Sequence, residues 1–365
     1  MIKAIRSLAR LFPLLTLLIT PAIGCAESIS EDLYSFQMLI GGDQITLPCT
    51  YEKLTQAGWT YNGDAEELLK PEDRTVSSAW EKNGVLLYGE MVNNSWDVMP
   101  VKNCVLAAVE VVESAGKAVL PGGILPGVSH LREVINAYGT PSASHESADV
   151  TQYTYHLDYD QEAIFSFYTA TGILKEASLR NVVMAAAPDP RALKGSSASG
   201  SAAGYHAPGS LGDDPFSFYV SFGGALYALP APVAEFVKNG WVLTGGADSA
   251  VKAYGSGQLT LNLNGDQWTT WVYNNSDKAA LAGDCLITTI VSDLNKGDAP
   301  LLLPGGVTTG MTEEEALAVY GAYPVKTSES GSLRRHSFLS GRTGIVLSVQ
   351  HSTGIVSRVE VSNTP

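Results

Sequence analysis

The stretch Leu303-Pro-Gly-Gly-Val-Thr-Thr-Gly310-Met-Thr-Glu-Glu-Glu-Ala-Leu-Ala-Val-Tyr320-Gly321-Ala-Tyr-Pro324 has a counterpart 183 positions earlier in the chain. The counterpart reads Leu120-Pro-Gly-Gly-Ile-Leu-Pro-Gly127-Val-Ser-His-Leu-Arg-Glu-Val-Ile-Asn-Ala-Tyr138-Gly139-Thr-Pro141. Each copy has the pattern of a loop rich in proline and glycine, a short amphipathic helix and an abrupt stop. Because the pattern occurs twice, we expect two copies of one folded unit.

The start of the helix is more complete in the second copy than in the first. Thr312 suits the N-cap position, and Glu315 three residues later completes a capping box. In the first copy Ser129 is the expected cap, and Arg132 occupies the place of the acidic partner. The sequence therefore predicts a helix in both copies, with only half of the capping box in the first.

Each helix is expected to bury one apolar stripe and to end at a glycine. In the first copy the stripe, at positions i, i+3, i+4 and i+7, consists of Leu131, Val134, Ile135 and Tyr138. Gly139 and Gly321 suit left-handed helix C-caps, and Pro141 and Pro324 prevent the helices from continuing.

The repeat extends well beyond this helix. Residues 36–47 match residues 218–229, and both segments contain a Gly-Gly pair flanked by apolar residues. Trp59 and Trp241 follow at matched positions, and the spacing from Asn93 to Cys104 recurs from Asn274 to Cys285. The chain is therefore a duplication of a unit of about 150 residues, which is a normal size for one domain.

The fold class that these patterns predict is α+β, with two tandem homologous domains, each an antiparallel sheet with short helices. Tyr153, Tyr155 and Leu157 alternate with polar residues, which is typical of a half-buried strand. The first repeat is placed at residues 33–183 and the second at residues 214–365. Residues 184–213 are rich in Ala, Gly, Ser and Pro and are predicted to be a flexible linker.

Residues 1–24 have the features of a signal peptide. A basic start precedes an apolar run that is too short to span a membrane. Two cleavage sites compete. Small residues before Cys25 resemble a bacterial lipobox, whose cysteine is lipidated, although Ala22 stands where that motif usually has Leu. Gly24-Cys25-Ala26 also fits an ordinary signal peptidase. We expect an exported protein that is held at the membrane by a lipid on Cys25, or is secreted, with residues 25–32 as a tether.

The charge of the chain argues against nucleic acid as a partner. The formal net charge is −14, and removal of Lys3, Arg6 and Arg10 with the signal peptide makes it −17. A surface this acidic repels phosphate backbones. Solubility is the simpler explanation of the charge, and basic peptides or cations are the alternative partners.

Three cysteines remain if Cys25 is lipidated. Export permits a disulfide, and Cys49 with Cys104, inside the first repeat, is the natural pair. The second repeat keeps Cys285 but has Ala231 where Cys49 would be matched. Buried free thiols are therefore a second possibility.

The segment from Gly310-Met-Thr through Tyr320-Gly321 to Pro324, followed by three strands, resembles the SmpA/OmlA-like lipoproteins and the β-lactamase-inhibitor-protein-like fold. The whole unit is similar to tandem-repeat surface lipoproteins of Gram-positive bacteria. The segment at the start of each unit departs from the family pattern. The resemblance implies a binding or scaffold role in the cell envelope, and it transfers no catalytic residue.

No motif for catalysis, metal binding or a cofactor is recognisable in the sequence. The six histidines stand neither in a His-Glu-x-x-His motif nor at zinc-ligand spacing with cysteine, and none is matched between the repeats. The sequence also lacks a nucleophile elbow, a phosphate-binding loop and a dinucleotide-binding fingerprint. We therefore predict no catalytic residue, no metal site and no cofactor.

Aromatic residues that are not repeated offer a candidate binding patch for protein, peptide or glycan. Trp59 and Trp241 recur and are expected in the core. The residues of the candidate patch are Trp80, Trp96, Trp268, Trp271 and Tyr273. The expected function is that of a non-catalytic binding or scaffold module for protein or wall components. The alternative is an exported hydrolase with an unrecognised active site.

Overall fold

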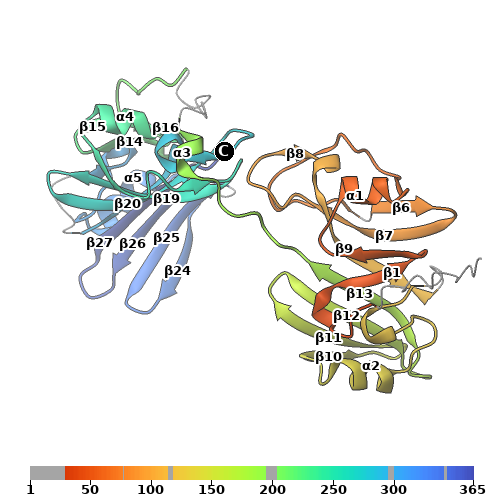
Figure 1. Ribbon diagram of the computed structural model, residues 1–365. Coiled ribbons are helices and arrows are strands. Elements are labelled where there is room, and N and C mark those ends of the chain that lie inside the picture. Colours follow the sequence, from red (N-terminus) through yellow and green to blue (C-terminus); the bar gives the residue numbers. More distant parts are fainter. Residues whose placement is uncertain (1–28, 77, 114–117, 195–203, 295–299, 341–342) are drawn as a thin grey trace, which may run out of the picture.

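The computed structural model contains two similar α+β units, which Figure 1 shows one after the other along the chain. The structure describes residues 29–76, 78–113, 118–194, 204–294, 300–340 and 343–365. Cys25 and the predicted signal peptide lie outside these residues. Each unit has its own hydrophobic core, and the two cores share no residue. The predicted fold class is therefore confirmed.

The first unit is organised around a nine-stranded antiparallel sheet with the order β10-β11-β12-β13-β9-β7-β6-β4, to which β3 is added beside β9. Its strands are β1 (Gln37–Ile40), β2 (Asp43–Thr46), β3 (Cys49–Thr50), β4 (Thr60–Tyr61), β5 (Leu68–Leu69), β6 (Ser78–Lys82), β7 (Val85–Val92), β8 (Met99–Pro100), β9 (Val105–Val112), β10 (Ala143–Glu146), β11 (Val150–Asp158), β12 (Gln161–Tyr168) and β13 (Leu174–Asn181). The predicted hairpin at residues 36–47 corresponds to β1 and β2.

The second unit repeats this arrangement with the order β24-β25-β26-β27-β22-β20-β19-β17, and β16 is added beside β22. Its strands are β14 (Tyr219–Phe222), β15 (Ala225–Ala228), β16 (Ala231–Pro232), β17 (Val242–Gly245), β18 (Ala250–Val251), β19 (Ser256–Leu263), β20 (Asp266–Tyr273), β21 (Ala280–Leu281), β22 (Leu286–Asp293), β23 (Leu301–Leu302), β24 (Lys326–Ser330), β25 (Leu333–Ser340), β26 (Thr343–Gln350) and β27 (Ile355–Ser362). The two strand orders correspond one to one.

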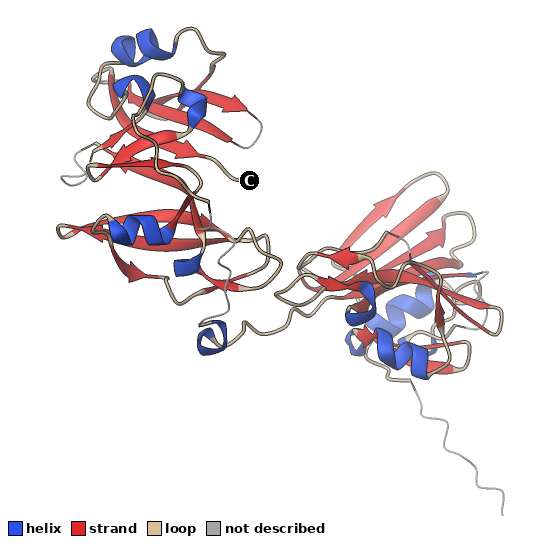
Figure 2. Cartoon of the chain, turned by 90° about the horizontal axis from the view of Figure 1, so that it is seen from above, coloured by secondary structure: helices blue, strands red, loops and turns tan. Residues whose placement is uncertain are grey.

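Short helices cover one face of each sheet, as the second view shows (Figure 2). The helices on the sheets are α1 (Tyr51–Gln56), α2 (Leu131–Tyr138), α4 (Val233–Lys238) and α5 (Glu313–Tyr320), and α3 (Pro190–Leu193) lies in the segment predicted as a linker. In the first unit Tyr51 of α1 packs on Trp80 of β6, with 4.9 Å between the ring centroids. Tyr138 of α2 packs on Phe165 of β12 at 5.3 Å. The opposite face of each sheet carries no helix in the described residues, and we call it the open face.

The repeated Leu-Pro-Gly-Gly stretch and the repeated helix are joined by one hydrogen bond in each unit. The hydroxyl of Tyr320, the last residue of α5, donates to the carbonyl oxygen of Pro304 at 2.9 Å. Tyr138 makes the same bond to Pro121 at the end of α2. Gly305 has a φ of +72°, so the turn that presents this carbonyl favours glycine. The loop and the helix therefore form one structural element.

Three details of the repeated helices differ from the prediction. The N-cap of α2 is His130 instead of Ser129, and its acidic partner is Glu133, because the turn after Gly127 is one residue longer than in the second unit. The capping box of Thr312 and Glu315 is confirmed. Gly321 has right-handed helical geometry, and Gly139 combines a φ of +79° with a ψ of −156°, so neither glycine has the predicted left-handed C-cap conformation.

The predicted stripe is also narrower than expected. Val134 is fully buried, but 37% of Ile135 is exposed. An eight-residue helix that lies on a sheet covers that sheet mainly with its central residues. Trp59 and Trp241 are both buried, as their recurrence predicted.

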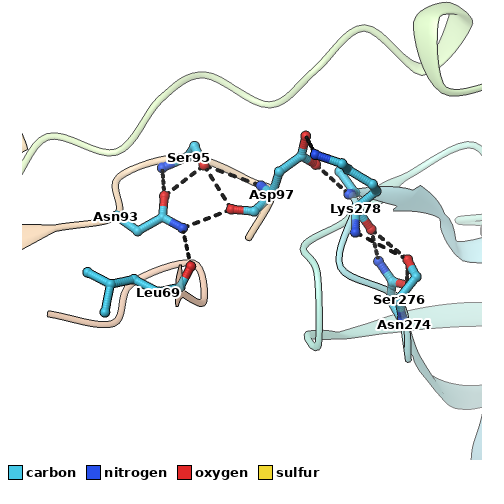
Figure 3. Close-up of polar contacts among 8 residues, drawn as sticks. Leu69, Asn93, Ser95, Asp97, Asn274, Ser276 and Lys278 are labelled. Carbon is cyan, nitrogen blue, oxygen red and sulfur yellow. Dashed lines mark hydrogen bonds and ion pairs between the residues drawn. The ribbon is translucent and has the colours of Figure 1, made fainter. Parts of the chain in front are cut away.

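The two units meet where two corresponding loops contact each other (Figure 3). Asp97 of the first unit accepts a hydrogen bond from the backbone N–H of Ala279 at 2.7 Å and lies 3.5 Å from the ammonium of Lys278. The backbone N–H of Val98 donates to the carbonyl oxygen of Asp277 at 2.9 Å. We call this contact region the junction.

The segment predicted as a linker contacts both units in the parts that the structure describes. The N–H of Ala185 donates to the carbonyl oxygen of Asn94 in the first unit. The hydroxyl of Tyr205 accepts a hydrogen bond from the N–H of Ala228 in the second unit. Residues 195–203 lie outside the described residues, and the flexibility of residues 184–213 stays a prediction.

Candidate functional site

Two of the five aromatic residues proposed for a binding patch lie in the hydrophobic cores. Trp80 packs between Tyr51 and Tyr61, and Trp268 packs against Trp241 and Phe222. Both tryptophans are almost completely buried. Assigning them to a surface patch was therefore wrong. The reason is that core residues in a duplicated fold can exchange positions between neighbouring strands, so a tryptophan that is not repeated can still be a core residue.

Trp96 belongs to the junction instead of an open surface. Its indole N–H donates to the carbonyl oxygen of Ala185 at 3.1 Å. The ammonium of Lys252, from the second unit, lies 5.4 Å from the centroid of its ring. The carbonyl oxygen of Trp96 accepts a hydrogen bond from the N–H of Ala253. This aromatic side chain therefore helps to connect the units and the start of the linker.

Trp271 and Tyr273 lie on the open face of the second sheet. Because residues two apart on a strand point to the same side, the two rings share this face of β20. The exposed fraction of Trp271 is 44%, and Tyr273 is half-buried. Partial burial raises the pKa of the Tyr273 phenol, and the neighbouring Tyr254 raises it further, so this group stays uncharged at neutral pH. The surface that remains of the predicted patch is centred on Trp271.

The residues around Trp271 are polar but uncharged. The strand register places Gln258 of β19 and Thr289 of β22 on either side of Trp271, and Ser362 of β27 beyond Thr289. The hydroxyls of Thr289 and Ser362 are 2.9 Å apart and share a hydrogen bond. The next row pairs Thr260 with Thr269. We call the surface formed by these residues the uncharged face: Gln258, Thr260, Thr269, Trp271, Ser362 and Thr289, of which Thr289 is buried between its neighbours.

The row of the first sheet that corresponds to the row of Trp271 is charged. Glu90 of β7 holds the place of Trp271, and Arg180 of β13 holds the place of Ser362, on either side of Ala108. The guanidinium of Arg180 lies 2.8 Å from the Glu90 carboxylate, which Arg74 also approaches at 3.3 Å. Duplication therefore kept the fold of this face and changed the chemistry of this row, from an ion pair to hydroxyls, an amide and one exposed indole, while Arg358 further along β27 still pairs with Asp293 and Glu360.

A cavity of 270 Å³ on the first unit is a weaker candidate. Its lining consists of Glu72, Arg74, Val92, Tyr159, Asp160, Arg180, Val182 and Met184. Most of its charged groups are already engaged, since Arg74 and Arg180 hold Glu90, and Glu72 forms an ion pair with Lys252 across the junction. A charged ligand has to compete with these existing pairs for its partners.

The cysteines are buried free thiols, and the proposed pairing of Cys49 with Cys104 was wrong. Cys49, Cys104 and Cys285 are all unbonded. The Cys104 and Cys285 thiols point to backbone carbonyl oxygens four residues earlier, those of Pro100 and Leu281. Burial raises the pKa of both thiols to about 12 and also raises the pKa of Cys49. Each thiol is therefore packed as a small apolar group inside its own unit.

One histidine takes part in a polar network that the sequence did not reveal. His336 of β25 is buried, and its Nε2 lies 2.7 Å from the Oε1 of Glu313, the first residue of α5. Its Nδ1 lies 3.1 Å from the hydroxyl of Thr327 in β24. Arg334 donates to both oxygens of Glu313 at 3.1 and 3.0 Å. These residues are separated by up to 23 positions, and none forms a recognisable spacing motif.

The ionisation of Glu313 follows from this network. Partial burial raises the pKa of the carboxyl, but the hydrogen bonds and charges of Arg334 and His336 lower it more, so the pKa lies below its ordinary value. The carboxylate is thus charged at neutral pH, and the network ties the start of α5 to β25.

The sequence contains a pattern that predicts only part of the uncharged face. In β19, Gln258 and Thr260 alternate with the apolar residues Leu259 and Leu261, whereas in β20 the alternation is broken, because the buried Thr270 is polar and the exposed Trp271 is aromatic. Period-2 alternation therefore predicts the solvent-facing side of β19, but it does not place Trp271 on the same face. Thr289 and Ser362 could not be added, because only the pairing of distant strands brings them there.

Two features are absent from the residues that the structure describes. These residues include no group of three or more His, Cys, Asp and Glu that could hold a metal ion. They also include no helix with the length and hydrophobicity needed to cross a bilayer. Comparison with known proteins gave no match: no family model, curated protein or solved structure resembles the chain closely enough to be counted.

Proposed function

We propose that the chain is an exported protein, anchored at the cell membrane through a lipid on Cys25, that binds a neutral glycan of the envelope without catalysing a reaction. The observation that carries the proposal is the contrast between the two open faces. One row holds Glu90 and Arg180 in the first unit, and Trp271 and Ser362 in the second. The support for export is the basic and apolar N-terminal segment of the sequence.

The chemistry of the uncharged face suits a sugar chain. A pyranose ring presents C–H groups on its flat faces and hydroxyls around its edge, so it is matched by an exposed aromatic ring with neutral hydrogen-bonding groups around it. Trp271 supplies the ring, and Gln258, Thr269 and Thr260 supply amide and hydroxyl groups. No charged side chain lies in the row from Gln258 to Ser362, so this row offers no charge complementarity to a protein partner.

The test measures binding of the mature protein to neutral polysaccharide particles, with cellulose, chitin and amylose as probes. We expect binding that changes little with salt, because no ion pair contributes. Trp271→Ala should weaken binding about 30-fold, since loss of an aromatic anchor costs about 2 kcal/mol. The matched control is Tyr88→Ala, which truncates a similarly exposed aromatic residue on the open face of the first unit.

Two results would contradict binding of a neutral glycan at the uncharged face. If Trp271→Ala keeps its circular dichroism spectrum and binds every probe as the parent chain does, the uncharged face does not bind glycans. If binding occurs but disappears at high salt, the partner is recognised through charge, and a protein or charged polymer replaces the neutral glycan.

A second candidate function, that of an exported hydrolase of esters or amides, is favoured by the network at His336. A hydroxyl at Nδ1 and a carboxylate at Nε2 is the arrangement in which an imidazole can take a proton from a nucleophile. Thr327 is exposed in strand β24, at the edge of the sheet, where a substrate can reach it. This candidate is second because Arg334 holds the same carboxylate and reduces its ability to stabilise a charged imidazole.

The hydrolase candidate is tested with p-nitrophenyl acetate and with peptide-amide substrates. If the network is catalytic, Thr327→Val removes the nucleophile and abolishes turnover while the fold is kept. Thr327→Ser should retain turnover. If the parent chain hydrolyses none of the probes, or if Thr327→Val is as active as the parent, the network has a structural role only.

A further inference from the structure

The loops that meet at the junction are equivalent parts of the two units. The amide oxygen of Asn93 accepts hydrogen bonds from the N–H and hydroxyl of Ser95, at 2.9 and 2.7 Å. The amide oxygen of Asn274 accepts the same two bonds from Ser276, at 3.0 and 2.7 Å. Figure 3 shows the two loops facing each other with these bonds in place.

The same amides identify which residues correspond on the two sides. The amide nitrogen of Asn93 donates to the carbonyl oxygen of Asp97, and that of Asn274 donates to the carbonyl oxygen of Lys278. Asp97 and Lys278 therefore occupy the same position of the repeated loop. This position contacts its own equivalent across the junction, with 3.5 Å between carboxylate and ammonium. A position that meets itself lies on a two-fold axis.

Contacts away from this axis come in reciprocal pairs. Glu72 and Tyr254 are equivalent, because each has a positive φ, of 70° and 52°, in the corresponding turn two residues after a lysine. Lys252 of the second unit forms an ion pair with Glu72. Lys70 of the first unit, the equivalent lysine, lies over the ring of Tyr254 at 4.8 Å. The contact between Lys252 and Glu72 is thus the two-fold image of the contact between Lys70 and Tyr254.

The backbone contacts across the junction are related by the same two-fold axis, but only approximately. The N–H of Val98 donates to the carbonyl oxygen of Asp277. On the other side the N–H of Ala279, the equivalent of Val98, donates to the side chain of Asp97, next to Trp96. Reciprocal contacts of this kind are typical of the interface between two identical subunits.

We propose that the junction is a two-fold pairing surface present in both units, and that the charges of Asp97 and Lys278 on its axis make it specific for pairing of unlike units. Two first units paired in this way set Asp97 against Asp97, and two second units set Lys278 against Lys278. Like charges in direct contact oppose both arrangements. The partner that fits the surface of each unit is therefore the other unit, within one chain or from a second copy.

A second ion pair at the junction, between Lys252 and Glu72, also distinguishes the pairing of unlike units from the pairing of two second units. Lys252 meets Glu72 only when the units are unlike, because a second copy of the second unit presents Tyr254 at that place. Two first units retain favourable contacts between Lys70 and Glu72, so the position on the axis is the one that opposes their pairing. Specificity therefore depends most on residues 97 and 278.

Pairing is measured through the disulfide that forms between two cysteines, introduced into the full chain by Val98→Cys and Asp277→Cys. The N of residue 98 and the O of residue 277 are 2.9 Å apart, so the two α-carbons are within the reach of a disulfide. The rate of intrachain bond formation under mild oxidation is compared in four backgrounds: the parent charges, Asp97→Lys, Lys278→Asp, and both reversals together.

We expect each single reversal to slow bond formation several-fold at low salt, and the double reversal to restore the parent rate. Lys102→Asp is the control, because Lys102 forms an exposed ion pair with Glu66 inside the first unit, at 2.6 Å. If the double reversal stays as slow as the single ones, or if the single reversals have no effect, charge at the axis does not control pairing.

Mixing the two single-reversal chains tests pairing with a second copy. Each of these chains has like charges at residues 97 and 278, but the mixture offers Asp97 of one chain to Lys278 of the other. We expect interchain disulfides in the mixture above the level in either chain alone. An equal level in all three samples overturns the claim that unlike charge selects the partner.

Discussion

The three thiols show how burial decides the chemistry of a single residue. The thiolate is the form that reacts with alkylating reagents and disulfides, and burial raises the pKa values of Cys104 and Cys285 to about 12. At pH 8 the native chain holds almost no thiolate at these positions. Burial also raises the pKa of Cys49, so its reactivity is lowered in the same way.

We predict that a chain beginning at Glu27, which lacks Cys25, reacts with a thiol reagent slowly at pH 8 when native and yields three thiols when unfolded in denaturant. A disulfide between Cys49 and Cys104 would leave one thiol, that of Cys285. Counting thiols with and without prior reduction distinguishes the two results.

Gly305 is a second residue whose environment can be tested directly. Its φ is +72°, and a β-carbon at this position would lie 2.4 Å from Cγ1 of Val319 on α5. Gly306 also has a positive φ, of +79°, but a β-carbon added there would have no other atom within 4 Å. The two glycines therefore separate backbone strain from steric clash.

We predict that Gly305→Ala destabilises the second unit by about 2 kcal/mol more than Gly306→Ala does, since overpacking a close contact costs on the order of 1–3 kcal/mol. Denaturant unfolding followed by tryptophan fluorescence measures the difference. Equal losses for the two variants would mean that the helix shifts away from the added methyl group without cost.

At the scale of elements, α5 differs from α2 in how its start is attached to the sheet. Glu313 ties α5 to His336 and Arg334, whereas α2 begins with Leu131, which packs against the first core. The folded pKa of Glu313 lies below its ordinary value of 4.5. Its stabilising contribution is therefore complete above the unfolded pKa and is lost as pH falls through the folded pKa.

We predict that Glu313→Gln lowers the stability of the second unit at pH 7, on the order of 2 kcal/mol for a charge-assisted hydrogen bond. The difference from the parent chain should shrink as pH decreases below 4.5 and disappear once Glu313 is protonated. Glu314→Gln, an exposed neighbour on the same helical turn, is the control. A difference that is independent of pH would show that the charge of Glu313 does not contribute.

At the scale of the whole molecule, the proposed function requires the chain to be exported and attached at one end. Cys25 is followed by residues 26–32 before the first described helical turn, Leu33–Ser35. A lipid on Cys25 would place the first unit next to the membrane and leave the second unit, with its uncharged face, connected through the junction. Glycan binding by the uncharged face and pairing of the units at the junction are thus independent, because they depend on different residues.

We predict that cells expressing the chain and fed an alkyne fatty acid incorporate the label, and that Cys25→Ser prevents incorporation while Cys49→Ser does not. Mass spectrometry of the mature N-terminus is the second measurement. An unlabelled protein that begins at Glu27 would show cleavage by an ordinary signal peptidase and leave secretion without an anchor.

The local chemistry of the chain was sufficient to predict the duplication, the fold class and the repeated helices. Thr312, Glu315 and the Gly-Gly pairs act within a few residues of themselves, so their effect can be recognised in the sequence. The errors in the same elements were also local. His130 replaced Ser129 as the N-cap because one extra residue in the turn moved the helix start, and patterns place such boundaries only approximately.

Only the tertiary structure decided which residues form the uncharged face and the junction. Burial of Trp80 and Trp268, the row from Gln258 to Ser362, and the contact of Asp97 with Lys278 all depend on which strands and loops become neighbours. Periodicity indicates which side of its strand a residue faces, but it does not indicate which distant residue lies beside it. Strand register and the packing of complete units supply that information, because they are set by the burial of both cores together.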